Sequence, residues 1–243
     1  MASFEQPNDV ATRVSVSVVL PVEEARHAFE RVVRGYADTL RALGQSWEVL
    51  LVPRVRADSR TACEQLTAIE PGIRTTTSAD GWGAAVRLGL RESVGELLCY
   101  TNWQRTPAAA LTEMLELGLR NPSLVLRANR RTRDTRARRL GSLLFNIECR
   151  VLLQTLAWDV NGTPKVFPRA FGKLLELQQD GDLLDAEFAL VCQRERYPVV
   201  EVPIDAASQS AGGSAVDYGA ALRMYSGLVG LRARSRRAQA RTP

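Results

Sequence analysis

Apolar runs and helical patterns alternate along the first half of the chain, and this alternation constrains the fold more than any other feature. Val14–Val22 is rich in β-branched residues, as expected of a strand buried on both faces of a parallel sheet. Glu24–Leu43 has apolar residues at helical spacing and is followed by Gly44, and Trp47–Val52 is a second apolar run. The order strand, helix, strand predicts a parallel unit with a helical crossover.

The alternation continues toward the C-terminal end and predicts one α/β domain. We expect further helices over residues 58–69, 84–92, 107–119, 138–156, 170–177, 186–194 and 218–234. We expect further strands over residues 73–77, 96–100, 123–127 and 199–202, and a short extended piece over 166–168. No internal repeat or linker interrupts the 243 residues, so we predict a single domain over residues 14–234, an N-terminal extension over 1–13 and a basic tail over 235–243.

Composition excludes several classes of protein. With 45% hydrophobic and 24% charged residues, the chain can bury a sizeable core. It has no apolar stretch of the roughly 18 residues that a membrane span requires, and no basic region followed by an apolar run at its start. We therefore expect a soluble, cytoplasmic protein. The four cysteines lie far apart, which predicts buried, reduced thiols rather than a metal site or a disulfide framework.

Histidine and arginine usage narrows the chemistry further. His27 is the only histidine, so a multi-histidine metal centre is excluded and a histidine-based triad would need this one residue. We expect His27 to lie on the surface, because its segment is polar. The net charge of +5 comes almost wholly from arginine and favours anionic partners, among them phosphates, nucleic acids and membrane surfaces.

The loops after the predicted strands are where chemistry is expected, because open α/β sheets bind ligands beyond the carboxyl ends of their strands. These loops begin at Pro21, Pro53, Thr77 and Thr101. In one of them, Gly81 and Gly83 precede a helix. Two readings of this turn stay open: its glycines let the backbone approach an anionic ligand, or they only allow a tight connection from strand to helix.

Several segments together resemble one known family. They are DVNGTPKVFPR at residues 159–169, the glycine turn with GELLCY at 95–100, DLLDAE at 182–187, and EVPID with AGGSAVDYGAALRM after residue 200. From about Val14 to about Arg234 the chain resembles glycosyltransferase family 2, in its dolichyl-phosphate mannose synthase-like branch. The resemblance implies a GT-A-like fold, with three α/β/α layers around a mostly parallel sheet. It also implies a nucleotide half at about 14–105 and an acceptor half at about 106–234.

The sequence departs from this family at two acidic loops. Where the family has a DxD motif that binds a divalent ion, this chain has Thr101, Asn102 and Trp103. Where the family has DDGSxD, whose first aspartate recognises the nucleotide base, the chain runs from Pro53 to Asp58 and keeps only the last carboxylate. The Mg²⁺ or Mn²⁺ usual in the family thus lacks its ligands, and we predict no metal and no other cofactor.

Arginines offer a substitute for the missing ion. Arg54, Arg56 and Arg105 lie in the two altered loops, and guanidinium groups can neutralise a diphosphate by bidentate hydrogen bonds. The alternative is that these side chains are simply solvated.

The acidic segment of the second half supplies the candidate catalytic residues. In the family this segment provides the base that takes the proton of the acceptor while the sugar diphosphate leaves. By that resemblance Asp185 is the candidate base, with Glu187 second. The alternative for Asp185 is capping of a helix N-terminus.

A dense run of arginines precedes the long helix of the second half. Arg127–Arg139 contains seven of them, where the family has a basic loop over the acceptor side. This run and the basic tail favour a phosphate-bearing acceptor or peripheral contact with an anionic membrane. Nucleic acid ranks last as a partner, because no aromatic side chains are interleaved.

Together these features lead to a leading and an alternative function. The leading one is metal-independent transfer of a sugar from a nucleotide- or lipid-phosphate-linked donor to a small or lipid acceptor. The alternative is a pseudoenzyme, or a repurposed GT-A fold, that no longer uses a nucleotide sugar. The residues expected to bind substrate are Arg54, Arg56, Asp58, Asp80, Gly81, Trp82, Gly83, Asn102, Trp103, Arg105, Asp159, Asn161, Lys165 and Arg169.

Overall fold

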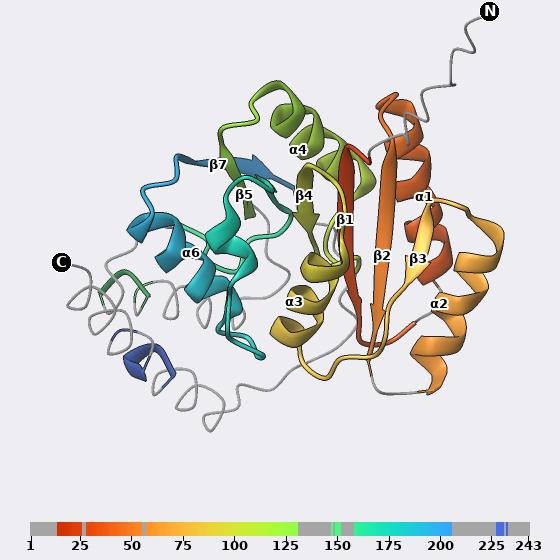
Figure 1. Ribbon diagram of the computed structural model, residues 1–243, viewed down its shortest axis with the longest axis horizontal. Coiled ribbons are helices and arrows are strands. Elements are labelled where there is room, and N and C mark those ends of the chain that lie inside the picture. Colours follow the sequence, from red (N-terminus) through yellow and green to blue (C-terminus); the bar gives the residue numbers. More distant parts are fainter. Residues whose placement is uncertain are drawn as a thin grey trace, which may run out of the picture.

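The computed structural model contains one seven-stranded sheet that runs through both predicted halves of the chain, as Figure 1 shows. It describes residues 14–25, 28–54, 57–130, 147, 149–151, 158–205, 227–230 and 232. The strand order is β3-β2-β1-β4-β6-β5-β7. Every pair is parallel except the two pairs made by β6, which confirms the predicted α/β fold with a mostly parallel sheet.

The first half follows the alternating order expected from the sequence. Its elements are β1 (Val16–Val22), α1 (Phe29–Ala42), β2 (Trp47–Pro53), α2 (Ala57–Ile69), β3 (Ile73–Thr75), α3 (Trp82–Glu92), β4 (Leu97–Tyr100) and α4 (Ala108–Arg120). The carboxyl ends of β1 and β2 lie at the lower edge in Figure 1. The expected loops at the ends of β1, β2 and β4 therefore meet at one edge of the sheet.

The second half departs from simple alternation. Its elements are β5 (Val125–Arg130), β6 (Lys165–Pro168), the 3₁₀ turn η1 (Gly172–Leu175), α6 (Leu184–Arg194) and β7 (Val199–Ile204). The short extended piece expected near residue 166 is a fully buried strand that runs antiparallel between β4 and β5. The helix expected over residues 170–177 is wrong: only the short η1 turn forms, and its one buried residue is Leu174.

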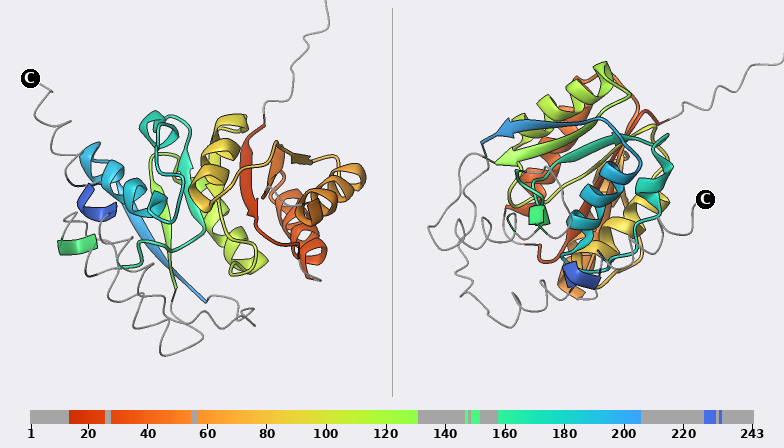
Figure 2. Two further views of the ribbon diagram at one scale, coloured as in Figure 1. Left: turned by 90° about the horizontal axis from the view of Figure 1, so that it is seen from below. Right: turned by 90° about the vertical axis from the view of Figure 1, so that its left-hand side faces the viewer.

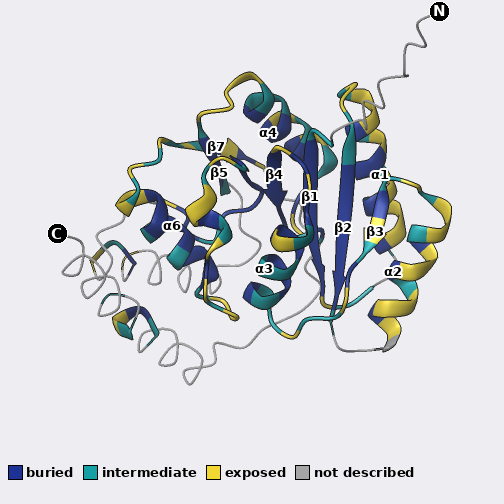
Figure 3. Ribbon diagram, viewed as in Figure 1, coloured by how far each residue is buried: buried dark blue, intermediate teal, exposed yellow. Residues whose placement is uncertain are grey.

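Helices cover both faces of the sheet, and each face has its own core. The left view of Figure 2 shows α3 and α6 on one side and α1 and α4 on the other. Alternating strand residues separate the two cores: Val18 and Cys99 face α1, α2 and α4, whereas Val19 and Tyr100 face α3 and α6. Figure 3 shows the central strands as the most buried part of the molecule. Two helical layers around one sheet give the expected three-layer arrangement.

Two further expectations can be assessed in the described residues. Cys63, Cys99, Cys149 and Cys192 are all buried thiols that form no disulfide with one another, as predicted. Among the residues that the structure describes, no helix is long and apolar enough to cross a membrane. His27, most of the arginine run, the greater part of the long helix expected over residues 138–156 and the basic tail lie outside the described residues.

Candidate functional site

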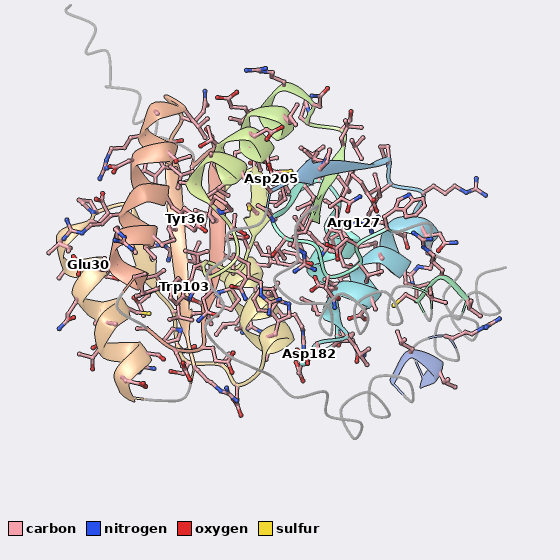
Figure 4. The ribbon with its side chains drawn as sticks, turned by 180° about the vertical axis from the view of Figure 1, so that it is seen from behind. Glu30, Tyr36, Trp103, Arg127, Asp182 and Asp205 are labelled. Atoms are coloured by element: carbon pink, nitrogen blue, oxygen red, sulfur yellow. The ribbon has the colours of Figure 1, made fainter. Side chains whose placement is uncertain are left out.

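A pocket of about 290 Å³ lies at the edge of the sheet where β1, β2 and β4 end. Its apolar lining comes from Pro21, Val22, Val52, Ala79, Trp82, Ala85 and Trp103, and its polar lining from Glu23, Arg54, Asn102, Gln104 and Asp182. Figure 4 labels Trp103 and Asp182, which approach the pocket from opposite halves of the chain. The pocket thus combines apolar walls with a few charged and amide groups, which is the usual make-up of a small-molecule site.

An arginine held between two carboxylates lies at the end of β2. Arg54 donates from Nη1 to Glu23 Oε1 at 2.5 Å and from Nε to Asp80 Oδ1 at 2.9 Å. The side chain of Glu23 is 74% exposed and that of Asp80 is 71% exposed. The hydrogen bond to Asp80 and the charge of Glu23 raise the pKa of Arg54, so the guanidinium stays charged. We call Glu23, Arg54 and Asp80 the arginine trio.

The turn after β4 replaces the DxD motif with groups already engaged in the protein. The Oδ1 atom of Asn102 accepts a hydrogen bond from the backbone amide of Gln104 at 2.9 Å. The hydroxyls of Thr101 and Thr106 are 2.7 Å apart and close the turn. Trp103 is only 4% exposed and packs edge-on against Phe29, so it mainly fills space under the pocket.

These side chains do not fit a divalent ion. Hard cations take several carboxylate, carbonyl or water oxygens, and the oxygen-bearing side chains of the turn after β4 are only amides and hydroxyls, of which Asn102, Thr101 and Thr106 are bonded within the turn. Across the described ranges, no group of three acidic, histidine or cysteine side chains is placed to hold a metal.

The glycine turn before α3 accommodates the protein's own backbone. A Cβ atom on Gly83 would lie 2.3 Å from the carbonyl oxygen of Gln179, and one on Gly81, whose φ is +99°, would lie 2.6 Å from that of Asp180. The backbone amide of Ala84, in the first turn of α3, donates to the same Asp180 carbonyl at 2.9 Å. We call residues Gln178–Asp182 the strap. Close approach of the strap accounts for both glycines, and Gly81 also lines the pocket.

Charged side chains fix the strap further. Arg87 on α3 donates to the carbonyl of Gln178 and to the carboxylate of Asp180. Glu187 Oε2 accepts hydrogen bonds from the backbone amides of Gln178 at 2.8 Å and Gln179 at 2.9 Å. The second candidate base is therefore engaged in holding the strap, which carries Asp182 to the pocket.

The first candidate base, Asp185, lies in the first turn of α6 and is 4% exposed. Its Oδ1 accepts from Lys165 Nζ at 2.5 Å and from Tyr100 Oη at 2.8 Å. Burial lowers the pKa of Lys165, and the Asp185 carboxylate partly offsets this shift. Burial raises the pKa of Tyr100, and Asp185 raises it further. The side chain of Asp185 does not cap α6. The N-cap position is occupied by Leu183, and no side-chain hydrogen bond caps the helix there.

Lys165 and Tyr100 belong to a polar row that crosses the sheet. At one register, β4, β6, β5 and β7 contribute Tyr100, Lys165, Arg127 and Glu201 as successive neighbours. Arg127 is 6% exposed and donates to Glu201 Oε1 at 2.5 Å. We call these four residues with Asp185 the polar row. Its charges are paired inside the protein, as buried charges must be.

The remaining predicted residues divide between the acceptor half and positions away from the pocket. Asp159 is 1% exposed and forms a bidentate ion pair with Arg130, at 2.7 and 2.9 Å. The Oδ1 atom of Asn161 is buried and has no hydrogen-bond partner among the described residues. Arg169 binds the carbonyls of Ser93 and Gly95, before β4, because β6 is antiparallel and ends at the opposite edge of the sheet.

Three loop residues complete the comparison with the sequence. Asp58 lies in the first turn of α2, where its side chain accepts a hydrogen bond from the amide of Ser59. Arg105 is exposed on the turn after β4. Arg56 lies outside the described residues.

Sequence reasoning missed three polar pocket residues. Glu23 follows the first predicted strand directly, so the strand-end rule could have identified it. Asp182 belongs to the quoted acidic segment but was passed over in favour of Asp185. Gln104 had no signal in the sequence, because only the turn geometry brings it to the pocket.

Comparison with known proteins identifies the architecture. The chain matches no protein-family model, and a search of curated proteins finds no similar sequence. Among solved structures, it is similar to glucosyl-3-phosphoglycerate synthase from Mycobacterium tuberculosis in complex with Mn²⁺, uridine diphosphate and phosphoglyceric acid. The TM-score is 0.67 at 13% identity, over 91% of this chain and 78% of that chain. The chain has the GT-A fold.

Two further structures agree with this assignment. The same synthase in complex with uridine diphosphate gives a TM-score of 0.66 at 12% identity, covering 96% of this chain and 86% of that chain. A mycobacterial protein gives a TM-score of 0.62 at 14% identity, covering 90% of this chain and 73% of that chain. At such low identity the likeness shows the fold alone, so the GT-A part of the expected resemblance is confirmed and its family 2 branch stays a prediction.

Proposed function

We propose that this protein transfers a glycosyl group from a nucleotide-linked donor without a carboxylate-bound divalent ion. The observation that carries the proposal is the pocket at the ends of β1, β2 and β4, which has apolar walls, the arginine trio at the end of β2, and a turn after β4 whose side chains at 101–103 include no carboxylate. In the GT-A fold this edge of the sheet is the expected ligand site. The proposed acceptor is a small or lipid molecule, as the sequence resemblance implies.

The structural neighbours support a nucleotide as the ligand, whereas the Mn²⁺ found with one of them does not fit this chain. One of them was solved with uridine diphosphate, phosphoglyceric acid and Mn²⁺. By likeness of fold, we place a nucleoside diphosphate in the pocket of this chain. The turn after β4 does not fit Mn²⁺, so the charge of the diphosphate must be met by guanidinium groups and backbone amides. Arg105 is the described candidate, because it lies on that turn.

Asp185 remains the proposed base for inverting transfer. Lys165 and Tyr100 both donate to its Oδ1, which fixes the carboxyl group and leaves Oδ2 as the oxygen that would take the proton of an acceptor hydroxyl. Asp182, which is exposed and lines the pocket three residues earlier, is the second proposed acidic residue of the reaction centre.

The second candidate function is nucleotide or partner binding without transfer. It is favoured by the engagement of both candidate bases: Asp185 is paired with Lys165 in the interior, and Glu187 holds the strap. Asp185→Asn separates the two functions. If the protein is a transferase, this variant binds nucleotide as before but loses turnover by a factor of about 10²–10⁴, the usual contribution of a general base. Unchanged turnover would remove Asp185 from the mechanism.

The test of the proposal is calorimetric binding of nucleoside diphosphates and nucleotide sugars, once in EDTA and once with Mn²⁺. We expect binding of the same affinity under both conditions. Binding that appears only with Mn²⁺ would show that the residues around the pocket assemble a metal site after all. No binding of any nucleotide would refute the proposed donor site.

A further inference from the structure

Exposed apolar side chains gather at one end of the acceptor half. Across the described residues, the large apolar side chains that are exposed are Ile69, Val94, Ile147, Val151, Trp158, Val200 and Val229. Ile147 and Val151 belong to one short helical segment and Val229 to another, and both segments lie beside α6 in Figure 1. Their buried residues Cys149 and Leu228 pack with α6 in one small core. The two segments are therefore held to the protein by one side and expose apolar side chains on another.

Ile147, Val151 and Trp158 form one surface. Ile147 and Val151 are four positions apart in a helical segment, so their side chains are neighbours on the face opposite the buried Cys149. Arg150, three positions after Ile147, places its guanidinium carbon 4.1 Å from the centre of the Trp158 ring. Ile147 is 53% exposed, Val151 65% and Trp158 67%. We call these three residues with Arg150 the apolar patch.

Two carboxylates beside Trp158 are neutralised within the protein. Asp159, the next residue in the chain, is 1% exposed and forms its bidentate ion pair with Arg130. Glu201 accepts hydrogen bonds from the backbone amide of Trp158 at 2.8 Å and from Arg127 at 2.5 Å. Because both carboxylates are paired with arginines, neither adds a net negative charge next to the patch. The bond to Glu201 also fixes the backbone at Trp158.

The parts of the sequence that contain these two helical segments are strongly basic. Residues 127–151 contain eight arginines and two acidic residues, and residues 227–243 contain five arginines and no acidic residue. Each basic side chain near an anionic lipid surface strengthens binding about fivefold. Tryptophan is typical of the boundary between lipid headgroups and acyl chains, because its ring is apolar and its N–H is polar. Apolar insertion and electrostatic attraction are two signals that together give stable attachment to a bilayer.

Two other partners fit this surface less well. A second copy of the chain would bring Arg150 and the adjoining basic sequence close to their own copies in a symmetric contact, where like charges oppose association. A nucleic acid would need aromatic faces on which to stack its bases. One face of Trp158 is covered by Arg150, and an aliphatic side chain such as Val151 gains nothing from phosphates. The combination of charge and apolar side chains therefore favours an anionic bilayer.

We propose that the apolar patch docks the protein on an anionic lipid bilayer, with Trp158 at the level of the headgroups and Ile147 and Val151 inserted beside it. The peripheral membrane contact predicted from the arginine run is thereby assigned to particular residues. None of the four patch residues lines the pocket at the ends of β1, β2 and β4. The inference is independent of the proposed function, because attachment to a bilayer requires no nucleotide.

The test is co-sedimentation of the full chain with vesicles of phosphatidylcholine alone and of phosphatidylcholine mixed with phosphatidylserine, at low and at raised salt. We expect binding to the mixed vesicles only, and weaker binding at raised salt, because exposed charge contacts are screened. Binding should also shift the emission of Trp158 to shorter wavelength. Equal binding to both kinds of vesicle, or binding to neither, would overturn the inference. Binding without a change in tryptophan emission would also overturn it, since the ring would then stay in water.

Matched variants locate the contact. Val151→Asp replaces an inserted apolar side chain by a charge and should weaken binding to the mixed vesicles about tenfold or more. Val94→Asp is the control, because Val94 is 56% exposed, lies between α3 and β4, and carries the same change of charge outside the patch. Trp158→Phe should remove the emission shift while part of the binding stays. Urea unfolding of the three variants checks that each one folds.

Two outcomes of these variants would contradict the assignment. Equal weakening by Val151→Asp and Val94→Asp would mean that the apolar patch is not the docking surface. A concentration-dependent dimer in analytical ultracentrifugation that Val151→Asp abolishes would show that the patch binds a second copy of the chain instead, and the inference would be wrong.

Discussion

The arginine trio and the polar row are both clusters of paired charges, but they differ in burial. In the trio, the carboxylates of Glu23 and Asp80 are more than 70% exposed. In the row, Lys165 is 0% and Asp185 is 4% exposed. Exposed ion pairs contribute little to stability and can exchange partners, whereas a buried pair cannot lose one partner without a large cost. The trio is therefore suited to a ligand, and the row to fixing the base that would act on it.

The largest change in stability that we expect comes from alkaline pH, which acts on buried groups and not on the arginine trio. Burial raises the pKa of the thiols of Cys63 and Cys192 to about 12 each, and also raises those of Cys99, Tyr36 and Tyr100. The folded protein then holds protons that the unfolded chain releases, so stability falls as the pH rises above about 9, the ordinary pKa of a thiol.

The size of this effect can be estimated for each group. Each buried thiol should contribute a loss of about 1.4 kcal/mol per pH unit above 9. Lys165 acts in the opposite direction, because its pKa is lowered and the unfolded chain binds its proton more tightly up to pH 10.5. Urea unfolding at pH 8, 9 and 10 measures the sum. A flat profile would mean that these thiols are accessible to water in the folded protein.

The second prediction breaks one pair in each cluster. Lys165→Met leaves Asp185 buried without its ion-pair partner and should lower the free energy of unfolding by about 3–5 kcal/mol. The double variant Lys165→Met, Asp185→Leu should recover most of this loss, because an apolar pair replaces the lone charge. The matched change in the trio, Arg54→Met, should leave the midpoint of urea unfolding almost unchanged. Equal losses for Lys165→Met and Arg54→Met would erase the distinction between the clusters.

The third prediction concerns the strap, which connects the two regions. Gly83→Ala places a Cβ within 2.3 Å of the Gln179 carbonyl, so the strap must move, at a cost of about 1–3 kcal/mol. Gly35→Ala is the control: it lies within α1 and its Cβ would meet nothing within 4 Å, so it should stabilise the protein by about 0.5–1 kcal/mol. Thermal unfolding of the two variants measures both changes in stability. Stabilisation by Gly83→Ala would show that the strap does not pack against α3.

The smallest effect is expected at Glu187. Glu187→Gln weakens two hydrogen bonds from strap amides to a charged acceptor and should cost about 1–2 kcal/mol. Glu116→Gln, which breaks an exposed pair with Arg120 one helical turn away, should change stability by less than about 0.5 kcal/mol. Denaturant unfolding of both variants tests whether Glu187 contributes more to stability than an exposed ion pair does.

Much of the nucleotide half could be predicted from sequence, because its apolar runs are long and its connections are short. The strands and helices from β1 to α4 lie close to their expected bounds. The acceptor half was harder: β6 contains only four residues and carries Lys165, so its pattern does not indicate a central strand. Its burial depends on the partners Tyr100 and Asp185, which lie 65 and 20 positions away in the chain and are invisible to local patterns.

The candidate site was predicted in outline and not in detail. The strand-end rule led to the loops that line the pocket, and of the predicted residues Arg54, Gly81, Trp82, Asn102 and Trp103 line it. The roles of Gly81 and Gly83 depend on a backbone segment about 100 positions away, which no local pattern reveals. Arg169 lies at the edge of the sheet opposite the pocket, and the antiparallel direction of β6 that puts it there could not be deduced from four residues.

The position of β6 also determines how the sheet can be assembled during synthesis. β5 leaves the ribosome before the two strands that pair with it in the described part of the chain, β6 and β7. Until β6 arrives, β4 likewise lacks its neighbour on that side, although β1 to β4 can already pair. The nascent chain therefore carries unpaired edges on both β4 and β5, a condition that invites association with other chains. A chain cut short before residue 165 would keep the parallel half and aggregate through those edges.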